Sequence, residues 1–265
     1  MIGQFAAFRR DQLRLLTSVE QKYGGLAYFK LGPQHVYLVS DPKLIEQVLV
    51  LKNPTFTKSP FLRKARTFLG EGLLTAEGQQ HLRQRRLVQP AFHRDRLIRY
   101  ASEMVAIADK FRSRWQTGAT MDIDQEMMRL TLAVIGQTMF SADVEADAKQ
   151  VGDSMNTILG MFPTIILPYS EYLEKLPIPM ITRYHKAREA LDAIIYGFIE
   201  DRRANGRDHG DLLSMLIASR DHEGDGTGMT DKQVRDEAIT LFLAGHETTA
   251  NALTWTWICS VSTRM

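Results

Sequence analysis

A long helical pattern between about Thr230 and Ile258 constrains the fold of this chain more than any other stretch. Residues spaced three and four apart recur along it, and this spacing places them on one face of a helix. The members of this face are Val234, Ala238, Leu241, Gly245, Thr248, Ala252 and Trp255. The face is apolar at its ends and small or polar at its centre, where a glycine costs a helix ~1 kcal/mol relative to alanine. The close approach of another planar group would explain that glycine.

The centre of this pattern carries a motif, Ala244-Gly245-His246-Glu247-Thr248-Thr249. It resembles the oxygen-activation motif of the cytochrome P450 family, Ala/Gly-Gly-x-Asp/Glu-Thr-Thr/Ser. The resemblance implies that the helix passes flat over a haem at Ala244 and Gly245, and that Glu247 and Thr248 carry protons to the bound oxygen. A threonine within a helix can also bond back one turn, so we expect the Thr248 hydroxyl to bond to the Ala244 carbonyl. A buried helix with an accidental Glu-Thr-Thr is the alternative for this motif taken alone.

A second motif lies within residues 78–93, where His81 and Arg85 are four apart and share a helix face with apolar residues. This face suits a flat apolar disc with carboxylates at one edge. The segment is similar to the P450 helix that binds the haem propionates, Trp-x-x-x-Arg followed by Pro-Ala-Phe. His81 stands at the tryptophan position, which weakens that role without removing the donor. The alternative is a solvated basic face made by the clustered Arg83, Arg85 and Arg86.

Composition narrows the class of protein. The 265 residues are 44% hydrophobic and 24% charged, as in an ordinary globular protein. The net charge of +2 argues against a general nucleic-acid binder. No apolar run approaches the ~20 residues of a membrane span. One cysteine, Cys259, excludes an internal disulfide framework and fits a reducing compartment. With no cleavable signal pattern at the N-terminus, we expect a cytoplasmic protein.

The remaining patterns predict a mainly α fold with a small β-sheet near the N-terminus. We expect an amphipathic helix over residues 3–23, a β-hairpin from Leu26–Leu31 and His35–Val39, and a helix from Pro42 to about Leu49. Residues 53–78 are rich in proline and glycine and predict a loop. Further helices are expected at about 78–90, 95–116, 123–140, 146–162, 182–205, 211–220 and 230–258.

This order of elements is also the order of the first half of the P450 fold. The resemblance therefore implies one incomplete P450-like domain over residues 1–265, with helices and the hairpin at 1–50, a loop-rich stretch at 53–78, and helices over 78–262. The family's Glu-x-x-Arg pair and its Phe-x-x-Gly-x-Arg-x-Cys-x-Gly haem loop come well after the central helix. The chain reaches Met265 with neither, so we expect it to be truncated before the haem-cysteine loop.

Two metal motifs begin in the sequence but are not completed. His246-Glu247 starts like a zinc-protease motif, but Ala250 takes the place of the second histidine. Residues 221–226 resemble the start of a calcium loop, but Lys232 stands where a bidentate glutamate is required. We therefore expect no metal ion held by protein side chains in this chain, and a surface turn at residues 221–226.

The activity implied by the resemblance is that of a haem-thiolate monooxygenase. It inserts one atom of O2 into an apolar organic substrate, with electrons from NAD(P)H through a redox partner of the ferredoxin, flavodoxin or flavoprotein-reductase type. We expect the substrate wall to come from apolar residues of three segments, although plain core packing is the alternative for each residue. These residues are Phe68, Leu73, Leu74, Met161, Phe162 and Leu241.

Without the cysteine loop, residues 1–265 lack the thiolate ligand and are expected to be inactive alone. Two functions of other classes therefore remain open at this point. One is a non-catalytic truncated helical remnant that binds no iron. The other is a small-ligand-binding helical module.

Overall fold

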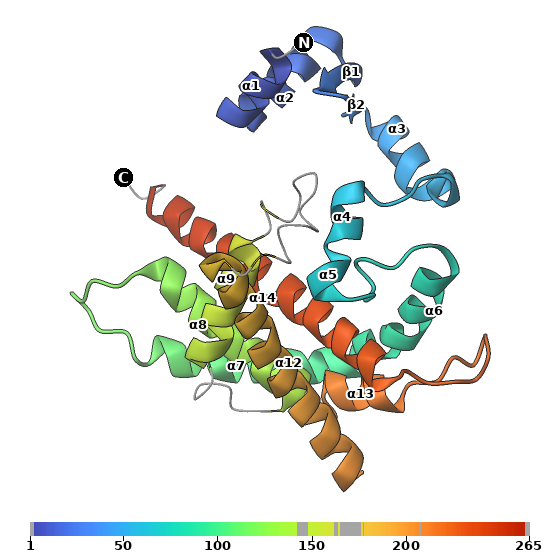
Figure 1. Ribbon diagram of the computed structural model, residues 1–265. Coiled ribbons are helices and arrows are strands. Elements are labelled where there is room, and N and C mark those ends of the chain that lie inside the picture. The colour runs from blue at the N-terminus through green and yellow to red at the C-terminus, as the bar shows by residue number, and fades with distance from the viewer. Residues whose placement is uncertain are drawn as a thin grey trace. The chain divides into compact units, whose positions relative to one another are not determined.

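The computed structural model describes residues 3–141, 148–161, 178–206 and 208–262, together with residues 164 and 176. Its contacts divide the chain into two compact units, Met1–Thr57 and Lys58–Met265 (Figure 1). Helices dominate the described residues, and the sheet found among them has two strands. The mainly α fold with a small N-terminal sheet is thereby confirmed, while a single domain over residues 1–265 stays a prediction.

The first unit begins with two helices where the sequence predicted one. α1 (Gly3–Arg10) and α2 (Gln12–Tyr23) are separated at Asp11, whose extended backbone and side chain cap α2 by accepting the Arg14 N–H at 2.9 Å. The prediction of one helix over residues 3–23 is therefore wrong at this position. The apolar periodicity does continue through residues 3–23. An aspartate side chain can nevertheless accept the first free N–H groups of a new helix, so a second helix begins after Asp11.

The predicted hairpin is present. β1 (Leu26–Leu31) and β2 (Gln34–Val39) pair antiparallel, with Tyr28 opposite Tyr37, and Gly32 adopts the positive φ of +60° that the tight turn requires. Asp41 then caps α3 (Pro42–Glu46), which continues as a π-helical turn at Gln47–Leu51.

The second unit holds the remaining helices. Two of them, α4 and α5, are short and lie in the stretch that the sequence predicted as a loop; proline at the first turn of α4 is compatible with a helix start. Their bounds and those of the longer helices are α4 (Pro60–Lys64), α5 (Arg66–Leu69), α6 (Gly78–Val88), α7 (Arg94–Arg112), α8 (Ile123–Phe140), α9 (Ala148–Gly160), α12 (Pro179–Asn205), α13 (Leu212–Ala218) and α14 (Asp231–Ser262).

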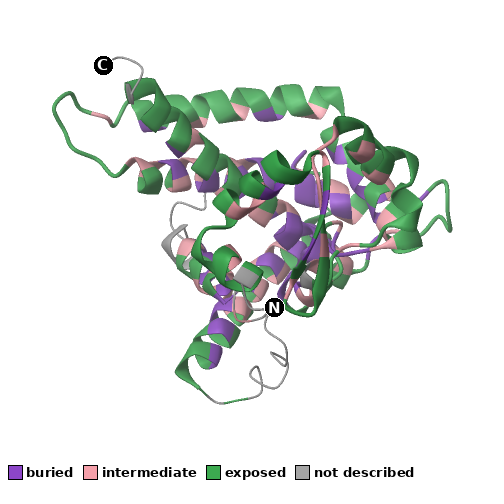
Figure 2. Ribbon diagram, turned by 90° about the horizontal axis from the view of Figure 1, so that it is seen from above, coloured by how far each residue is buried: buried purple, intermediate pink, exposed green. Residues whose placement is uncertain are grey.

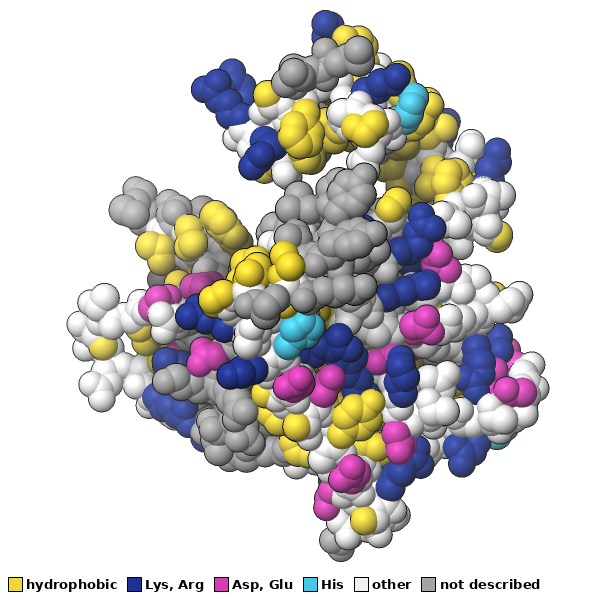
Figure 3. Space-filling model, in the orientation of Figure 1, with side chains coloured by type: hydrophobic (Ala, Val, Ile, Leu, Met, Phe, Trp, Pro, Cys, Tyr) yellow, Lys and Arg dark blue, Asp and Glu magenta, His cyan; other side chains and the backbone are white. Residues whose placement is uncertain are grey.

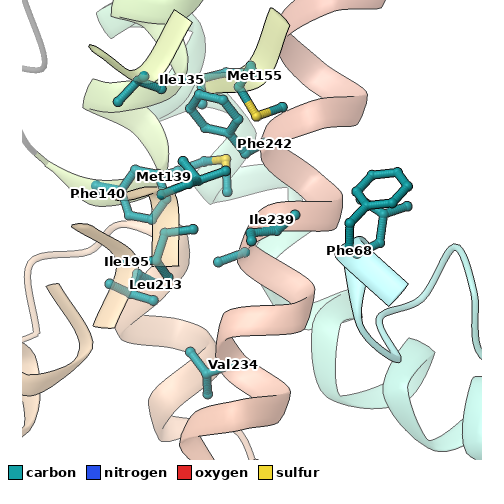
Figure 4. Packing of buried hydrophobic residues seen from close by; sticks show 14 of the residues in the cluster. Phe68, Ile135, Met139, Phe140, Met155, Ile195, Leu213, Val234, Ile239 and Phe242 are labelled. Atoms are coloured by element: carbon teal, nitrogen blue, oxygen red, sulfur yellow. The ribbon is translucent and has the colours of Figure 1, made fainter. Parts of the chain in front are cut away.

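The core of the second unit forms around α14. This helix packs along α8 and also contacts α12, α13 and α5 (Figure 1). Apolar side chains from these helices meet at the centre, as Figure 4 shows for Ile135, Phe140, Ile195, Ile239 and Phe242. Figure 2 shows the result along the helices, where stripes of buried residues alternate with exposed ones.

A buried ion pair joins three helices of this core. Arg202 on α12 donates to Asp211 Oδ2 at 2.9 Å and to the carbonyl of Phe140, the last residue of α8. Asp211 also caps α13 by accepting the Ser214 N–H at 2.8 Å. Since both charged side chains are almost fully buried, each depends on the other for compensation.

In the described part of the chain, no helix combines the length and the apolar character that crossing a bilayer would take.

Candidate functional site

The turn of α14 from Ala244 to Thr248 has the geometry expected from the sequence. The Thr248 hydroxyl donates to the Ala244 carbonyl. Both residues are exposed and lie one turn apart, so they share one face of the helix. Glu247, the predicted acid, is half-buried beside them. The structure thus brings a small side chain, a hydroxyl and a carboxyl together on two adjacent turns.

Gly245 turns toward a neighbouring helix. A Cβ atom at this position would lie 2.8 Å from Cδ1 of Ile135 on α8, closer than real Cβ contacts. The glycine therefore has a packing reason, since it lets α8 approach α14 closely. The small face left open to a planar ligand is the one formed by Ala244 and Thr248, and contact between Gly245 and a haem stays a prediction.

His246 belongs to the packing of the same helix pair. It is buried, and its Nδ1 lies 2.9 Å from Thr131 Oγ1 on α8. Because that hydroxyl donates to the Met127 carbonyl, the bond fits a histidine that donates from Nδ1. Burial lowers the pKa of His246 and keeps the ring neutral. Sequence reasoning missed this role, although Ala250 and Thr254 continue the same buried face at a spacing of four.

A cluster of charged residues at the start of α14 was also missed. Asp236 accepts the Glu71 N–H at 2.9 Å, and Glu237 accepts the Leu73 N–H at 3.0 Å. A Cβ atom on Gly70 would fall 2.1 Å from the Asp236 carboxyl, so a glycine is needed where the backbone meets this acid. The signal in the sequence was the run of charges at positions 235–237 inside an otherwise apolar helix. The carboxyl groups of Asp236 and Glu237 hold the loop 70–76 on α14.

The three clustered arginines of α6 have different surroundings. Arg86 makes two hydrogen bonds to Asp221, at 2.9 and 2.8 Å, and Arg83 donates to Thr227 Oγ1 at 2.7 Å. Arg85 is exposed, and its side chain makes no hydrogen bond or ion pair within the described residues. On the face drawn in Figure 3, basic and acidic side chains likewise lie beside one another. Of the three arginines, only Arg85 has the exposed, unpaired side chain that a solvated basic face would require.

His81 lies one turn before Arg85 and is half-buried. Its pKa is lowered first by burial and then by the positive charges of Lys58 and Arg85. A neutral histidine keeps one ring N–H to donate. The structure therefore places a donor and an unpaired cation on consecutive turns of α6, as the sequence predicted.

The segment that resembled a calcium loop is instead an arginine-binding turn. Hydrogen bonding from Arg86 lowers the pKa of Asp221, which keeps that carboxylate charged and occupied. Within the described ranges, no three side chains of the His, Cys, Asp and Glu types gather as a metal site.

The predicted substrate residues separate into groups. Phe68 and Met161 are buried, Leu73 and Leu241 are half-buried, and Leu74 is 39% exposed. Phe162 lies outside the described residues. Of the described ones, Phe68 lines a small apolar pocket between α5, α9, α12 and α14, with a volume of about 10 Å³, the space of roughly one water molecule. The other lining residues are Leu69, Met155, Ile158, Arg188, Leu191, Arg235, Ile239 and Leu243.

The chain is similar in sequence to several known proteins. The chain is 37% identical over 260 residues to cyclooctatin synthase of Streptomyces melanosporofaciens, an alignment that covers 97% of this chain and 56% of that protein. It is 36% identical to cyclooctat-9-en-7-ol 5-monooxygenase of the same organism, covering 96% and 55%. Pentalenene oxygenase of Streptomyces avermitilis is 34% identical, with 96% and 56% covered. The chain thus spans about half the length of these relatives. The sequence pattern of the cytochrome P450 family matches residues 1–259, and the chain belongs to that family.

Proposed function

We propose that this chain forms the oxygen-activating half of a haem-dependent monooxygenase that inserts one atom of O2 into an apolar organic substrate. The observation that carries the proposal is the open face of α14, where Thr248 bonds to the Ala244 carbonyl beside the half-buried Glu247. The names of the similar proteins, a monooxygenase and an oxygenase among them, support the same reaction class. Electrons would come from NAD(P)H through a ferredoxin, flavodoxin or flavoprotein reductase, and the cytoplasm is the proposed location.

The side chains on α6 and α14 fit a haem. Arg85 offers a cation without a protein partner in the described part, and His81 offers a ring N–H. These two would hold the propionates, while Ala244 would leave room for the ring; Gly245 packs against Ile135 of α8 and stays a proposed haem neighbour only. When bound, the haem supplies the iron centre at which dioxygen is activated.

Thr248 and Glu247 would deliver protons to the reaction. The Thr248 hydroxyl already has its hydrogen bond to the Ala244 carbonyl, so its oxygen can accept a further hydrogen bond on the exposed face. Glu247 provides a carboxyl group at the preceding position of the helix. A positioned acid of this kind contributes about 10²–10⁴-fold to reactions that need a proton.

The apolar substrate would be held against a wall that includes Phe68 and the neighbouring loop. Ile239 and Leu243 bring α14 to that wall, and Leu241 lies on the same helix. The cation of Arg235 is paired with Asp192 at 2.8 Å, which leaves the lining apolar in effect. Leu73, Leu74, Met161 and Phe162 remain proposed members of this wall.

The apolar residues around Phe68 would equally fit the wall of a small-ligand-binding helical module. Such a module gives no role to the exposed Thr248 or to Arg85, so these two residues discriminate between the two functions. A non-catalytic remnant would likewise show no haem-linked effect of either residue.

The role of Thr248 is tested by Thr248→Ala in a protein of the relatives' full length, made by joining residues 1–265 to the second half of a relative. The haem should be retained because Thr248 is not among its proposed ligands. Product formed per NAD(P)H consumed should fall roughly tenfold or more, with peroxide rising in its place. Thr249→Ala, which changes the next exposed hydroxyl, serves as the control. Unchanged coupling in Thr248→Ala would remove this residue from the mechanism.

A second prediction concerns Cys259, the one cysteine of the chain. It is exposed on α14, about three turns after Thr248, or roughly 16 Å along the axis at 1.5 Å per residue. It also faces the same way as Thr248, whose face of α14 is the one proposed for proton supply, so Cys259 is not among the residues that would hold the iron. Residues 1–265 mixed with haem, reduced and exposed to carbon monoxide should therefore give no thiolate-type Soret band, and Cys259→Ser should change nothing. A red-shifted band that is lost in Cys259→Ser would contradict this.

A further inference from the structure

The loop 70–76 is held on α14 by side chains that lie far from it in sequence. Besides the bonds from Asp236 and Glu237, Arg235 donates to the Phe68 carbonyl, and Gln84 on α6 donates to the Glu71 carbonyl. The loop carries Leu73 and Leu74 and leads directly into α6. Its position therefore affects both the proposed substrate wall and the start of the helix that bears His81 and Arg85.

Glu237 differs from the other anchors in its surroundings. Its side chain is fully buried, with an exposed fraction of 0%. Oε2 accepts the Leu73 N–H, while Oε1 has no hydrogen-bond partner in the described part of the chain. A buried carboxyl with one unsatisfied oxygen is costly to ionise. The bond to Leu73 is thus made by a group whose charge state depends on pH.

The charged groups around Glu237 do not supply a strong counter-charge. On α14, its neighbour Asp236 is already engaged by Lys232 at 2.7 Å and by Arg235 at 2.9 Å. On the segment before α6, Lys58 directs its ammonium to the carbonyls of Leu73, Leu74 and Ala76. Arg66 also lies in this segment, where it donates to the Thr75 carbonyl.

We propose that Glu237 is a positioning residue whose protonated form holds Leu73 and the loop 70–76 against α14, and whose ionisation releases that loop. Opening of the loop would expose the carboxyl to water, which favours the charged form. Ionisation and opening therefore favour each other by linkage. The importance of this for substrate rests on the proposed function, whereas the response of the loop to pH does not.

The direction of the pH effect follows from the surroundings. Burial, together with the smaller effect of the Asp236 charge, raises the pKa of Glu237 from 4.5 to about 7, against the lowering effects of the Leu73 N–H and of the Lys58 charge. A carboxyl whose pKa is raised in the closed state binds its proton more tightly there. The closed state is thus favoured at low pH and weakened as pH rises from about 4.5 through about 7.

Hydrogen–deuterium exchange of residues 1–265 without haem tests this proposal. After correction for intrinsic exchange rates, protection of the amides at 71–76 should fall roughly 30-fold from pH 5.5 to pH 8, which follows from the two pKa values. Glu237→Gln keeps an acceptor for the Leu73 N–H but cannot ionise, so its profile should be flat. Glu71→Gln, an exposed acid in the same loop, should behave like the unchanged chain.

The β-hairpin at residues 26–39 provides an internal reference, because it lies in the other compact unit and should show no such pH response. A flat profile in the unchanged chain, or an equal slope in Glu237→Gln, would overturn the proposal. Since no haem or substrate is present, neither outcome depends on the monooxygenase function.

Discussion

Asp211→Ala should destabilise the second unit by about 3–5 kcal/mol, the cost of removing one partner from a buried ion pair. The variant removes the buried counter-charge of Arg202, which keeps only the half-exposed Asp201 and the Phe140 carbonyl, and it also removes the cap of α13. Urea unfolding of residues 1–265, followed by circular dichroism, measures the loss. If the free energy of unfolding of the unchanged chain is smaller than this loss, the variant will already be unfolded without urea. That outcome also agrees with the prediction.

The matched control is Asp201→Ala. Asp201 pairs with the same arginine at 3.1 Å, but its side chain is 54% exposed. Water replaces an exposed partner at little cost, so this change should cost about 0–1 kcal/mol. Equal losses of stability in the two variants would show that burial does not determine how much Asp211 contributes to stability.

Arg85→Ala should lower the haem affinity of the full-length hybrid protein by roughly a hundredfold. Losing the partner of a partly buried carboxylate costs several kcal/mol, and each 1.4 kcal/mol is a factor of ten. The measurement is haem bound per protein, from the Soret absorbance during haem titration. Arg85→Lys should recover part of the affinity, since it keeps the charge but not the two-pronged geometry.

Arg83→Ala is the control on the same helix. Its Nη2 is already bonded to Thr227 and to the Gly228 carbonyl, and its charge lies 3.7 Å from the carboxylates of Asp221 and Asp225, so the cation is already paired within the protein. Its removal should reduce stability modestly and leave haem occupancy near that of the unchanged protein. Equal haem loss in Arg83→Ala and Arg85→Ala would return α6 to the role of a solvated basic face.

The parts of the fold that sequence predicted well are those fixed by local chemistry. The helix expected at about 123–140 is α8 (Ile123–Phe140), which Asp122 caps by accepting the Gln125 N–H. The turn between Ala244 and Thr248 was also predicted, because a helical threonine reaches its carbonyl within the same turn. In both cases the partners lie within four residues of each other.

The missed features depend on partners that are distant in sequence. The bond between His246 and Thr131 spans 115 positions, and the bond between Glu237 and Leu73 spans 164. A pattern of spacings within one helix cannot tell which other helix its polar residues will meet. The break at Asp11 is different, since two local signals competed there and the cap overrode the continuing apolar periodicity.

The pairing of Arg83 and Arg86 with the turn at residues 221–228 has a consequence for α6 itself. Anchors on both sides of Arg85 fix how far the helix is rotated about its own axis before any ligand arrives. An anionic ligand then meets a cation whose direction is already set, so less orientational entropy is lost on binding. High salt should weaken such binding twice, by screening Arg85 directly and by loosening the exposed Arg83–Asp225 contact that helps hold the helix in register.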